Sequence, residues 1–272
     1  MTRRRLTELL REAGVPSPGR EAEMLLCELF SLTPAALPAD PARDFSSPRL
    51  DDALARRKRR EPLQYILGKA YFCGEVYLLN DACLIPRPDT ELLVETAVKL
   101  LPENGCFADL FCGSGCVGIS LAAARRDASG VGTDLSEKAL EAARKNAAEN
   151  GTADRISFFA ADIRNAPLGE ERYDLITANP PYLTESEMRA LQPEVAFEPR
   201  AALDGGPDGL LFYRITLDLC SENLRPDGAF LFEIGYRQGA AVTALAESRG
   251  YRAELLRDLG GNDRVLLLKK YS

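Results

Sequence analysis

The fold is decided by the segment Asp109-Leu110-Phe111-Cys112-Gly113-Ser114-Gly115, which joins an apolar strand, Phe107–Cys112, to a helix, Val117–Arg126. A short buried strand that leads through glycines directly into a helix is typical of a parallel sheet covered by helices. Strand and helix patterns alternate strictly from this segment to the C-terminus. We therefore predict an α/β fold built on a doubly wound, Rossmann-like sheet of seven strands.

The alternating pattern places each predicted element of this sheet. The strands are predicted at Phe107–Cys112, Gly130–Leu135, Ile156–Asp162, Tyr173–Asn179, Ala229–Gly235, Ala253–Asp258 and Arg264–Lys270. The helices between them include Val117–Arg126, Glu137–Glu149, Phe212–Leu224 and Gln238–Arg249. Ser136 directly precedes one of these helices, so we expect its hydroxyl to cap the free N–H groups of the first turn.

Two further parts precede the sheet. Residues 1–68 show helical apolar periodicity and predict a small all-α domain. Its run Arg56-Arg57-Lys58-Arg59-Arg60 is interpreted as a solvated helix face, with contact to RNA or an acidic partner as the alternative. Residues 69–86 alternate around Gly74 and predict a β-hairpin linker. Residues 87–272 form the α/β domain.

Composition excludes several kinds of active site. The 272 residues contain no histidine, which rules out Ser-His-Asp and Cys-His catalysis and histidine-ligated metals. The seven cysteines show no paired metal-ligand spacing, so no metal site is predicted. No apolar run approaches membrane-spanning length, and the start is not that of a signal peptide, so we expect a cytoplasmic protein without membrane contact. The net charge of −7 argues against a large footprint on duplex DNA.

Three consecutive predicted strands carry an aspartate toward their carboxyl ends, namely Asp109, Asp134 and Asp162. Ligands of open α/β sheets bind beyond these ends, so the three acids are predicted to line a cofactor site. Asp134 suits a pair of ribose hydroxyls. Asp162, with Ile163 beside it as an apolar wall, suits an adenine amino group, and the alternative for Asp162 alone is a helix N-cap.

The glycine loop leaves two cofactors open. Its continuation, Gly113-Ser114-Gly115-Cys116-Val117-Gly118, matches the dinucleotide fingerprint, so a nicotinamide oxidoreductase is a competitor. Asp109 argues against it, because a carboxylate disfavours a pyrophosphate anion but favours the ammonium group of S-adenosylmethionine. The residues predicted to bind S-adenosylmethionine are Asp109, Phe111, Cys112, Gly113, Ser114, Gly115, Asp134, Leu135, Asp162, Ile163 and Asn179.

The acceptor site is predicted at Asn179-Pro180-Pro181-Tyr182, which follows the apolar strand Tyr173–Ala178. The two prolines stiffen the loop and offer carbonyl acceptors without competing N–H groups. Asn179 adds a side-chain acceptor, and Tyr182 adds a ring that can stack on a planar group. The set suits a flat substrate that carries an –NH2 group, either an amide or a nucleobase. A proline-rich turn that only caps the strand is the structural alternative.

With these motifs in place, nearly the whole chain resembles the HemK/PrmC family, the glutamine-N5 methyltransferases of peptide chain release factors. The resemblance rests on Arg60-Glu61-Pro62-Leu63-Gln64-Tyr65-Ile66-Leu67-Gly68, Leu84-Ile85-Pro86-Arg87-Pro88-Asp89-Thr90-Glu91, the glycine loop, Asn179-Pro180-Pro181-Tyr182 and Phe197-Glu198-Pro199-Arg200. The Asn-Pro-Pro-Tyr motif is shared with DNA adenine methyltransferases, whereas its combination with the Ile-Pro-Arg-Pro-Asp-Thr-Glu segment is highly specific. The chain departs from the family where glycine is usual and Phe111 stands instead, which could narrow the methionine end of the pocket.

The resemblance implies a class I methyltransferase domain that uses S-adenosylmethionine and releases S-adenosylhomocysteine. Its substrate would be the glutamine of the Gly-Gly-Gln motif of class I release factors, with no direct contact to nucleic acid, and the protein would be a monomer. We expect residues 1–68 to recognise this protein substrate, because every cofactor-type residue lies from Asp109 onward. The implied catalytic residues are Asn179, Pro180 and Tyr182, and Pro181 and Arg87 join them in substrate binding. Asn179 and the Pro180 carbonyl would accept the amide N–H groups while Tyr182 packs on the amide plane, so transfer would rely on positioning.

Three other functions compete with this one. A DNA N6-adenine methyltransferase would require a basic channel and base flipping, and the sequence shows no obvious target-recognition insert. A nicotinamide oxidoreductase would bind its dinucleotide at the glycine loop. A protein that binds release factors without turnover would have no need of Asn179 and the three acids.

Overall fold

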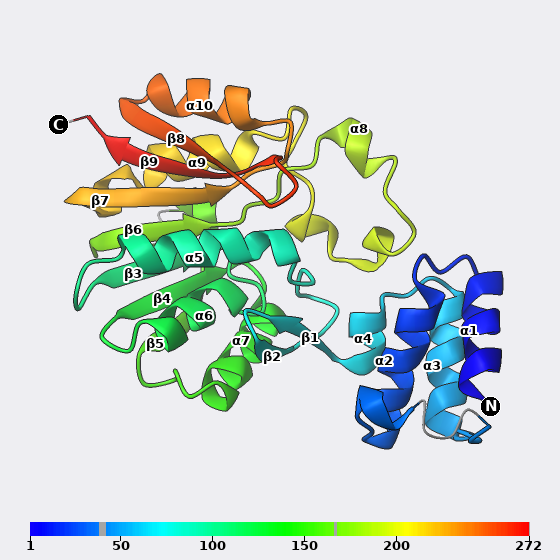
Figure 1. Cartoon of the computed structure of the whole chain (residues 1–272). Coiled ribbons are helices and arrows are strands. Elements are labelled where there is room, and N and C mark those ends of the chain that lie inside the picture. Colours follow the sequence, from blue (N-terminus) through cyan, green and yellow to red (C-terminus); the bar gives the residue numbers. More distant parts are fainter. Residues whose placement is uncertain (38–41, 166–167, 272) are drawn as a thin grey trace. The chain divides into compact units, whose positions relative to one another are not determined.

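The computed structural model describes residues 1–37, 42–165 and 168–271, and its elements are labelled in Figure 1. The chain divides into two compact units. We call Met1–Lys69 together with Gln192–Phe197 the helical unit, and Ala70–Leu191 together with Glu198–Ser272 the sheet unit. No helix in the described ranges is long and apolar enough to cross a membrane.

The helical unit is built from α1 (Arg3–Glu12), α2 (Pro18–Phe30), α3 (Pro48–Lys58) and α4 (Leu63–Leu67). Hydroxyls begin two of these helices, since Thr2 accepts from the Arg5 N–H and Ser47 accepts from the Leu50 N–H. Gly68 ends α4 in the left-handed conformation, at φ 70°. The apolar faces meet in a buried core that includes Leu6, Leu10, Leu25, Leu26 and Leu50.

The basic run is solvated only in part. Lys58 and Arg59 are exposed, as the solvated-face interpretation predicts, but that interpretation is wrong for Arg57. Arg57 is buried, and its guanidinium donates to Glu21 at 2.6 and 3.0 Å and to Glu194 at 3.0 Å. Arg60 donates to both oxygens of Glu194, at 2.6 and 2.7 Å. These ion pairs hold the segment that contains Glu194 within the helical unit. Local periodicity could not reveal the ion pairs with Glu194, because Arg57 and Arg60 are more than a hundred residues away from it in the sequence.

The sheet unit contains the predicted seven-stranded sheet, in the order β5-β4-β3-β6-β7-β9-β8. Its strands are β3 (Cys106–Leu110), β4 (Ser129–Asp134), β5 (Ile156–Ala160), β6 (Tyr173–Ala178), β7 (Leu224–Glu233), β8 (Tyr251–Arg257) and β9 (Asp263–Lys270). The first five pair in parallel, whereas β9 runs antiparallel to both β7 and β8. The Rossmann-like fold of the prediction is thereby confirmed.

Side chains that alternate along the strands produce two cores, one on each face of the sheet. Phe107 and Leu175 contribute to one core, while their neighbours Ala108 and Ile176 contribute to the other. The first core also receives α5 (Glu91–Leu100), α6 (Cys116–Ala124) and α7 (Glu137–Glu149), and Figure 1 shows α5 crossing that face. The second receives α9 (Leu211–Leu219) and α10 (Gly239–Glu247).

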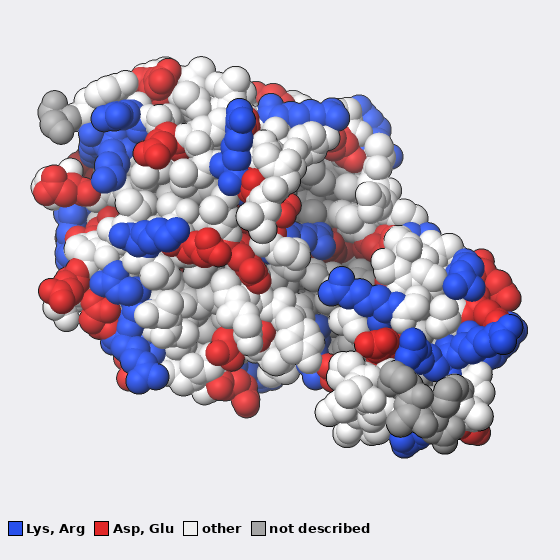
Figure 2. Space-filling model, viewed as in Figure 1, with Lys and Arg blue, Asp and Glu red and all other residues white. Residues whose placement is uncertain are grey.

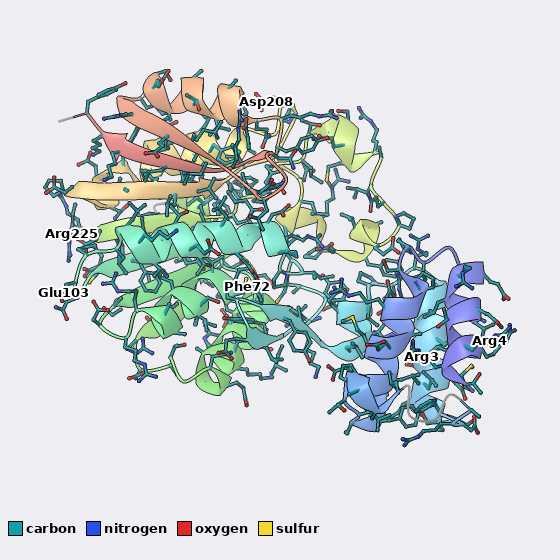
Figure 3. The ribbon with its side chains drawn as sticks, viewed as in Figure 1. Arg3, Arg4, Phe72, Glu103, Asp208 and Arg225 are labelled. Carbon is teal, nitrogen blue, oxygen red and sulfur yellow. The ribbon has the colours of Figure 1, made fainter. Side chains whose placement is uncertain are left out.

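The hairpin consists of β1 (Lys69–Phe72) and β2 (Glu75–Leu78) and packs onto the first core. Phe72, labelled in Figure 3, is buried with Tyr77, and their ring centroids lie 6.0 Å apart in an edge-on arrangement. Ser136 caps α7 as predicted, accepting from the Ala139 N–H. A short helix after β6, α8 (Glu185–Met188), has no counterpart in the prediction.

Glu194 provides a stability test of the helical unit. Burial acts to raise its pKa, but hydrogen bonds from Arg60 and Arg57 outweigh it and lower that pKa from 4.5 to about 2. A lowered pKa contributes stability that is complete above pH 4.5 and is lost as the pH falls toward 2. We expect Glu194→Gln to reduce the free energy of unfolding of this unit by about 1–3 kcal/mol at pH 7, and by less at pH 3.

Thermal and urea unfolding of both proteins at the two pH values measures this difference. The control is Glu23→Gln, which alters a surface glutamate of the same unit lying 4.0 Å from Arg3. If Glu194→Gln lowers the free energy of unfolding equally at pH 7 and pH 3, Glu194 acts through packing and not through its charge.

Candidate functional site

The carboxyl ends of the parallel strands open onto a cavity of about 560 Å³ that lies within the sheet unit. Most of the residues predicted to bind cofactor or substrate line it, namely Arg87, Asp109, Phe111, Cys112, Gly113, Ser114, Asp134, Leu135, Asp162, Ile163, Asn179 and Pro181. Gly115, Pro180 and Tyr182 lie outside the lining. Segments far apart in the sequence thus meet at one edge of the sheet.

The loop after β3 requires unusual backbone conformations. Phe111, Gly113 and Gly115 all have positive φ, at 57°, 54° and 78°. A Cβ atom on Gly115 would come within 2.9 Å of Ile119 and 3.1 Å of Phe158, so only glycine fits where the loop enters α6. Gly115 therefore allows the loop to pack closely on Ile119 and Phe158, although it does not itself line the cavity.

Both carboxylate oxygens of Asp109 accept hydrogen bonds from groups within the sheet unit. Its carboxylate accepts from the Gly118 N–H at 3.0 Å and from the Thr177 hydroxyl at 2.8 Å. Burial raises the pKa of Asp109 to about 7, despite these hydrogen bonds. A cation in the cavity would favour the ionised form, which agrees in sign with the predicted role beside an ammonium group.

Asp134 ties the glycine loop to the start of α7. One carboxylate oxygen accepts from the Gly113 N–H at 2.9 Å, and the other accepts from the Ser136 N–H at 2.9 Å. Burial raises the pKa of Asp134 above its ordinary value, although these N–H groups act to lower it. The carboxylate is oriented by two backbone donors at the cavity wall, and each oxygen retains a second lone pair for a ligand hydroxyl.

Asp162 begins a 3₁₀ turn, Ile163–Asn165, and its carboxylate accepts from the Arg164 N–H at 3.0 Å. The Arg164 guanidinium also binds it, at 2.6 to 3.0 Å, and holds the pKa of Asp162 below its usual range. The helix-capping alternative is therefore present in the structure together with the position at the cavity. Arg164 also lines the cavity, although the sequence analysis did not single it out.

Asn179 presents the most direct sign of a ligand. Its side-chain oxygen is buried and has no hydrogen-bond partner among the described residues. A buried acceptor without a partner costs about 1–3 kcal/mol, and a bound N–H group would remove that cost. Asn179 lines the cavity directly after β6, so the residue is suited to hold an –NH2 group there.

Gln238 fixes the loop that contains Tyr182. Its amide nitrogen donates to the carbonyl of Tyr182 at 3.0 Å and to that of Gly209 at 3.1 Å, while its amide oxygen accepts from the Gly235 N–H at 3.0 Å. Burial raises the pKa of Tyr182 to about 12, so its phenol remains neutral. Sequence reasoning did not find Gln238, because two of its partners, Tyr182 and Gly209, lie on distant segments of the chain.

Arg87 and Glu198 join two of the motifs that the sequence singled out. Glu198 is buried, accepts from the Ile85 N–H at 3.1 Å and binds the Arg87 guanidinium. Arg87 lines the cavity, and so does Pro199, the neighbour of Glu198. The ion pair therefore holds both motifs at the same site.

Comparison with known proteins agrees with this geometry. Residues 2–68 match the family described as the PrmC N-terminal domain, and residues 88–206 match the methyltransferase small domain. The chain is 38% identical over 262 residues to the release factor glutamine methyltransferase of Geobacter sulfurreducens, covering 94% of this chain and 91% of that protein. It is 40% identical over 262 residues to the protein of the same name from Cereibacter sphaeroides, covering 94% and 93%.

A solved structure shares the fold over most of the chain. The catalytic domain of hMettl16, in complex with the MAT2A 3'UTR hairpin 6, superposes with a TM-score of 0.57 and covers 83% of each chain. Its sequence identity is 14%, so this likeness concerns the arrangement of strands and helices alone.

Removing the side chain of Gln238 tests its hold on the loop. We expect Gln238→Ala to lower the free energy of unfolding by about 1–3 kcal/mol and to speed amide hydrogen exchange after Tyr182. Gln238→Glu is the matched variant, because it retains the acceptor for Gly235 but turns a carboxylate oxygen, in place of the donor, toward the carbonyls of Tyr182 and Gly209. If both variants exchange at the native rate, the loop is held by other contacts.

Proposed function

The chain belongs to the release factor glutamine methyltransferase family, and on that premise we propose that it methylates the glutamine of the Gly-Gly-Gln motif of class I release factors. The methyl group comes from S-adenosylmethionine and goes to the side-chain amide nitrogen. The observation that carries this proposal is the side-chain oxygen of Asn179, a residue of the cavity lining, which is buried and has no partner among residues 1–37, 42–165 and 168–271. An amide –NH2 group supplies the donor that this oxygen lacks.

The donor side of the cavity is formed by residues at or just beyond the carboxyl ends of β3, β4 and β5. S-Adenosylmethionine fits this set and supplies an electrophilic methyl group on a sulfonium. Asp134 accepts from the ribose hydroxyls, while Asp162 and Ile163 border the adenine. Asp109 contributes negative charge on the side of the ammonium group. The glycines of the loop after β3 have no side chain, so the backbone there can approach the cofactor closely.

The acceptor side holds the amide in place without a general base. An amide nitrogen is a weak nucleophile, because its lone pair is delocalised into the carbonyl. Two N–H bonds, to the Asn179 side chain and the Pro180 carbonyl, fix the nitrogen with its lone pair toward the methyl group. Tyr182 packs on the amide plane, and Arg87 completes the substrate side. Catalysis therefore depends on placement and preorganised dipoles.

The helical unit is assigned to recognition of the release factor. Every residue predicted to contact the cofactor lies in the sheet unit. The segment Gln192–Phe197, part of the helical unit, follows the Asn179–Tyr182 loop by only ten residues. Substrate bound by the helical unit is thereby connected along the chain to the loop that holds the amide.

The protein is proposed to act in the cytoplasm, as a monomer and without direct contact to nucleic acid. Three residues of the basic run support the last point, because Arg56, Arg57 and Arg60 are paired with Glu61, Glu21 and Glu194, which leaves only Lys58 and Arg59 of the run exposed. On the face shown in Figure 2, basic and acidic residues are interspersed, as expected for a chain of net charge −7. A nucleic-acid site would instead require a continuous basic surface.

The cofactor assignment is tested at Asp134. We expect Asp134→Ala to weaken binding of S-adenosylmethionine by about 1–3 kcal/mol, because charge-assisted hydrogen bonds to the ribose are lost. Calorimetry measures the affinity, with Asp154→Ala as control, since that acid is exposed and lies outside the cavity. Unchanged affinity would refute the role of Asp134.

The reaction itself is tested with purified release factor, S-adenosylmethionine and mass spectrometry of the Gly-Gly-Gln peptide. We expect the native protein to add one methyl group to the glutamine. Asn179→Ala removes the amide acceptor, so its single-turnover rate should fall by about two decades or more at saturating substrates. Asn179→Asp retains an acceptor but adds a charge near the sulfonium, so it should bind the cation more tightly and still react slowly.

Two results would contradict this mechanism. One is a normal single-turnover rate for Asn179→Ala. The other is methylation of adenine in DNA in place of glutamine, which would support the nucleobase alternative.

A further inference from the structure

Phe111 occupies a backbone conformation that ordinarily belongs to glycine. Its φ of 57° lies in the left-handed region, where a side chain costs about 1–2 kcal/mol. Of the five residues other than glycine that share this feature in the described chain, it alone lines the cavity. Strain retained at a ligand site points to a function for the side chain that causes it.

Strand register places Phe111 beside the proposed acceptor. Leu110, the last residue of β3, is paired with Ala178, the last residue of β6. The residue that follows β3 is Phe111, and the residue that follows β6 is Asn179. Both line the cavity. The aromatic side chain therefore originates at the end of the cavity where the amide would be held.

A second aromatic residue supports Phe111 from another element. Phe212, in the first turn of α9, lies edge-on to it with ring centroids 5.4 Å apart and an interplanar angle of 72°. Both rings are half-buried, both line the cavity, and both pack against the second core of the sheet. Such an edge-to-face pair is stabilised by about 0.5–1.5 kcal/mol, which offsets part of the strain and limits movement of the Phe111 ring.

We propose that Phe111 and Phe212 form an aromatic wall beside Asn179 that restricts the transferable group to methyl. This inference rests on the proposed function. Transfer breaks the bond from sulfur to the alkyl carbon, leaving that electron pair on sulfur as a thioether, and forms a bond from the carbon to the amide nitrogen. The amide proton then passes to water. A larger alkyl group needs space that the wall occupies, so S-adenosyl sulfonium donors with allyl or propargyl groups are excluded.

Phe111→Gly provides the main test, because it removes the ring and also relieves the backbone strain. We compare S-adenosylmethionine with its S-allyl and S-propargyl analogues, using calorimetry for Kd and mass spectrometry for transfer to release factor. The ratio of kcat/KM for the allyl donor to that for the methyl donor should rise by at least about tenfold, the scale on which a pocket discriminates one or two carbons. The corresponding ratio of affinities should rise in the same direction.

Three variants accompany it. Phe212→Ala removes the supporting ring without changing the Phe111 backbone and should shift both ratios in the same direction, by a smaller factor. Phe111→Ala provides the comparison if the glycine variant fails to fold. Leu135→Ala removes another apolar side chain of the cavity, after β4, and should alter the affinity for all donors without changing their ratio.

The possible results distinguish failure of the aromatic wall from failure of the proposed function. If the native protein methylates release factor but the ratios in Phe111→Gly remain within twofold of native, the wall does not select the donor. A native protein that uses the allyl donor as well as the methyl donor overturns the inference equally. If no transfer to release factor occurs but the Kd ratios shift as expected, the proposed function fails while the role of the aromatic wall stands.

Discussion

The site depends on one constraint, the parallel pairing of β3 with β4 on one side and β6 on the other. Parallel strands end at the same edge of a sheet, so the residues that follow them are brought together irrespective of their distance in sequence. Leu110 is paired with both Thr133 and Ala178 in this register. A shift of one residue would turn the side chains of a strand to the opposite core and displace Asp134 or Asn179 from the cavity.

A site without histidine must obtain its chemistry from position and from the local environment. Asp109 and Asp134 are partly or fully buried, and each is oriented by N–H or O–H donors of the surrounding backbone and side chains. The side-chain oxygen of Asn179 has no such partner in the part of the chain that the structure describes. The two acids are thus held in position by the protein itself, whereas the Asn179 oxygen can still accept a hydrogen bond. This arrangement is expected of a site that binds a substrate through an N–H group.

The glycine loop retains one strained residue other than glycine, Phe111. A glycine at position 111 would remove the strain of the left-handed backbone, yet the chain has phenylalanine there and supports its ring with Phe212. Elsewhere in the chain ion pairs serve the fold, as with Arg57 and Glu194 in the helical unit. The strained residue therefore stands out as one whose side chain faces the ligand cavity.

The sequence alone determined the strands, the glycine loop, the three acids and the Asn179–Tyr182 motif, because apolar periodicity and turn residues are local properties of the chain. Only the tertiary structure decided which side chains meet across long separations. Gln238 binds the carbonyl of Tyr182, Glu198 binds Arg87, and Phe212 packs on Phe111. The same separation hid the burial of Arg57, since a basic run on a helix has the same pattern whether it is solvated or paired. Local patterns specify the conformation of each segment, but packing of the finished sheet selects the partners of its polar and aromatic groups.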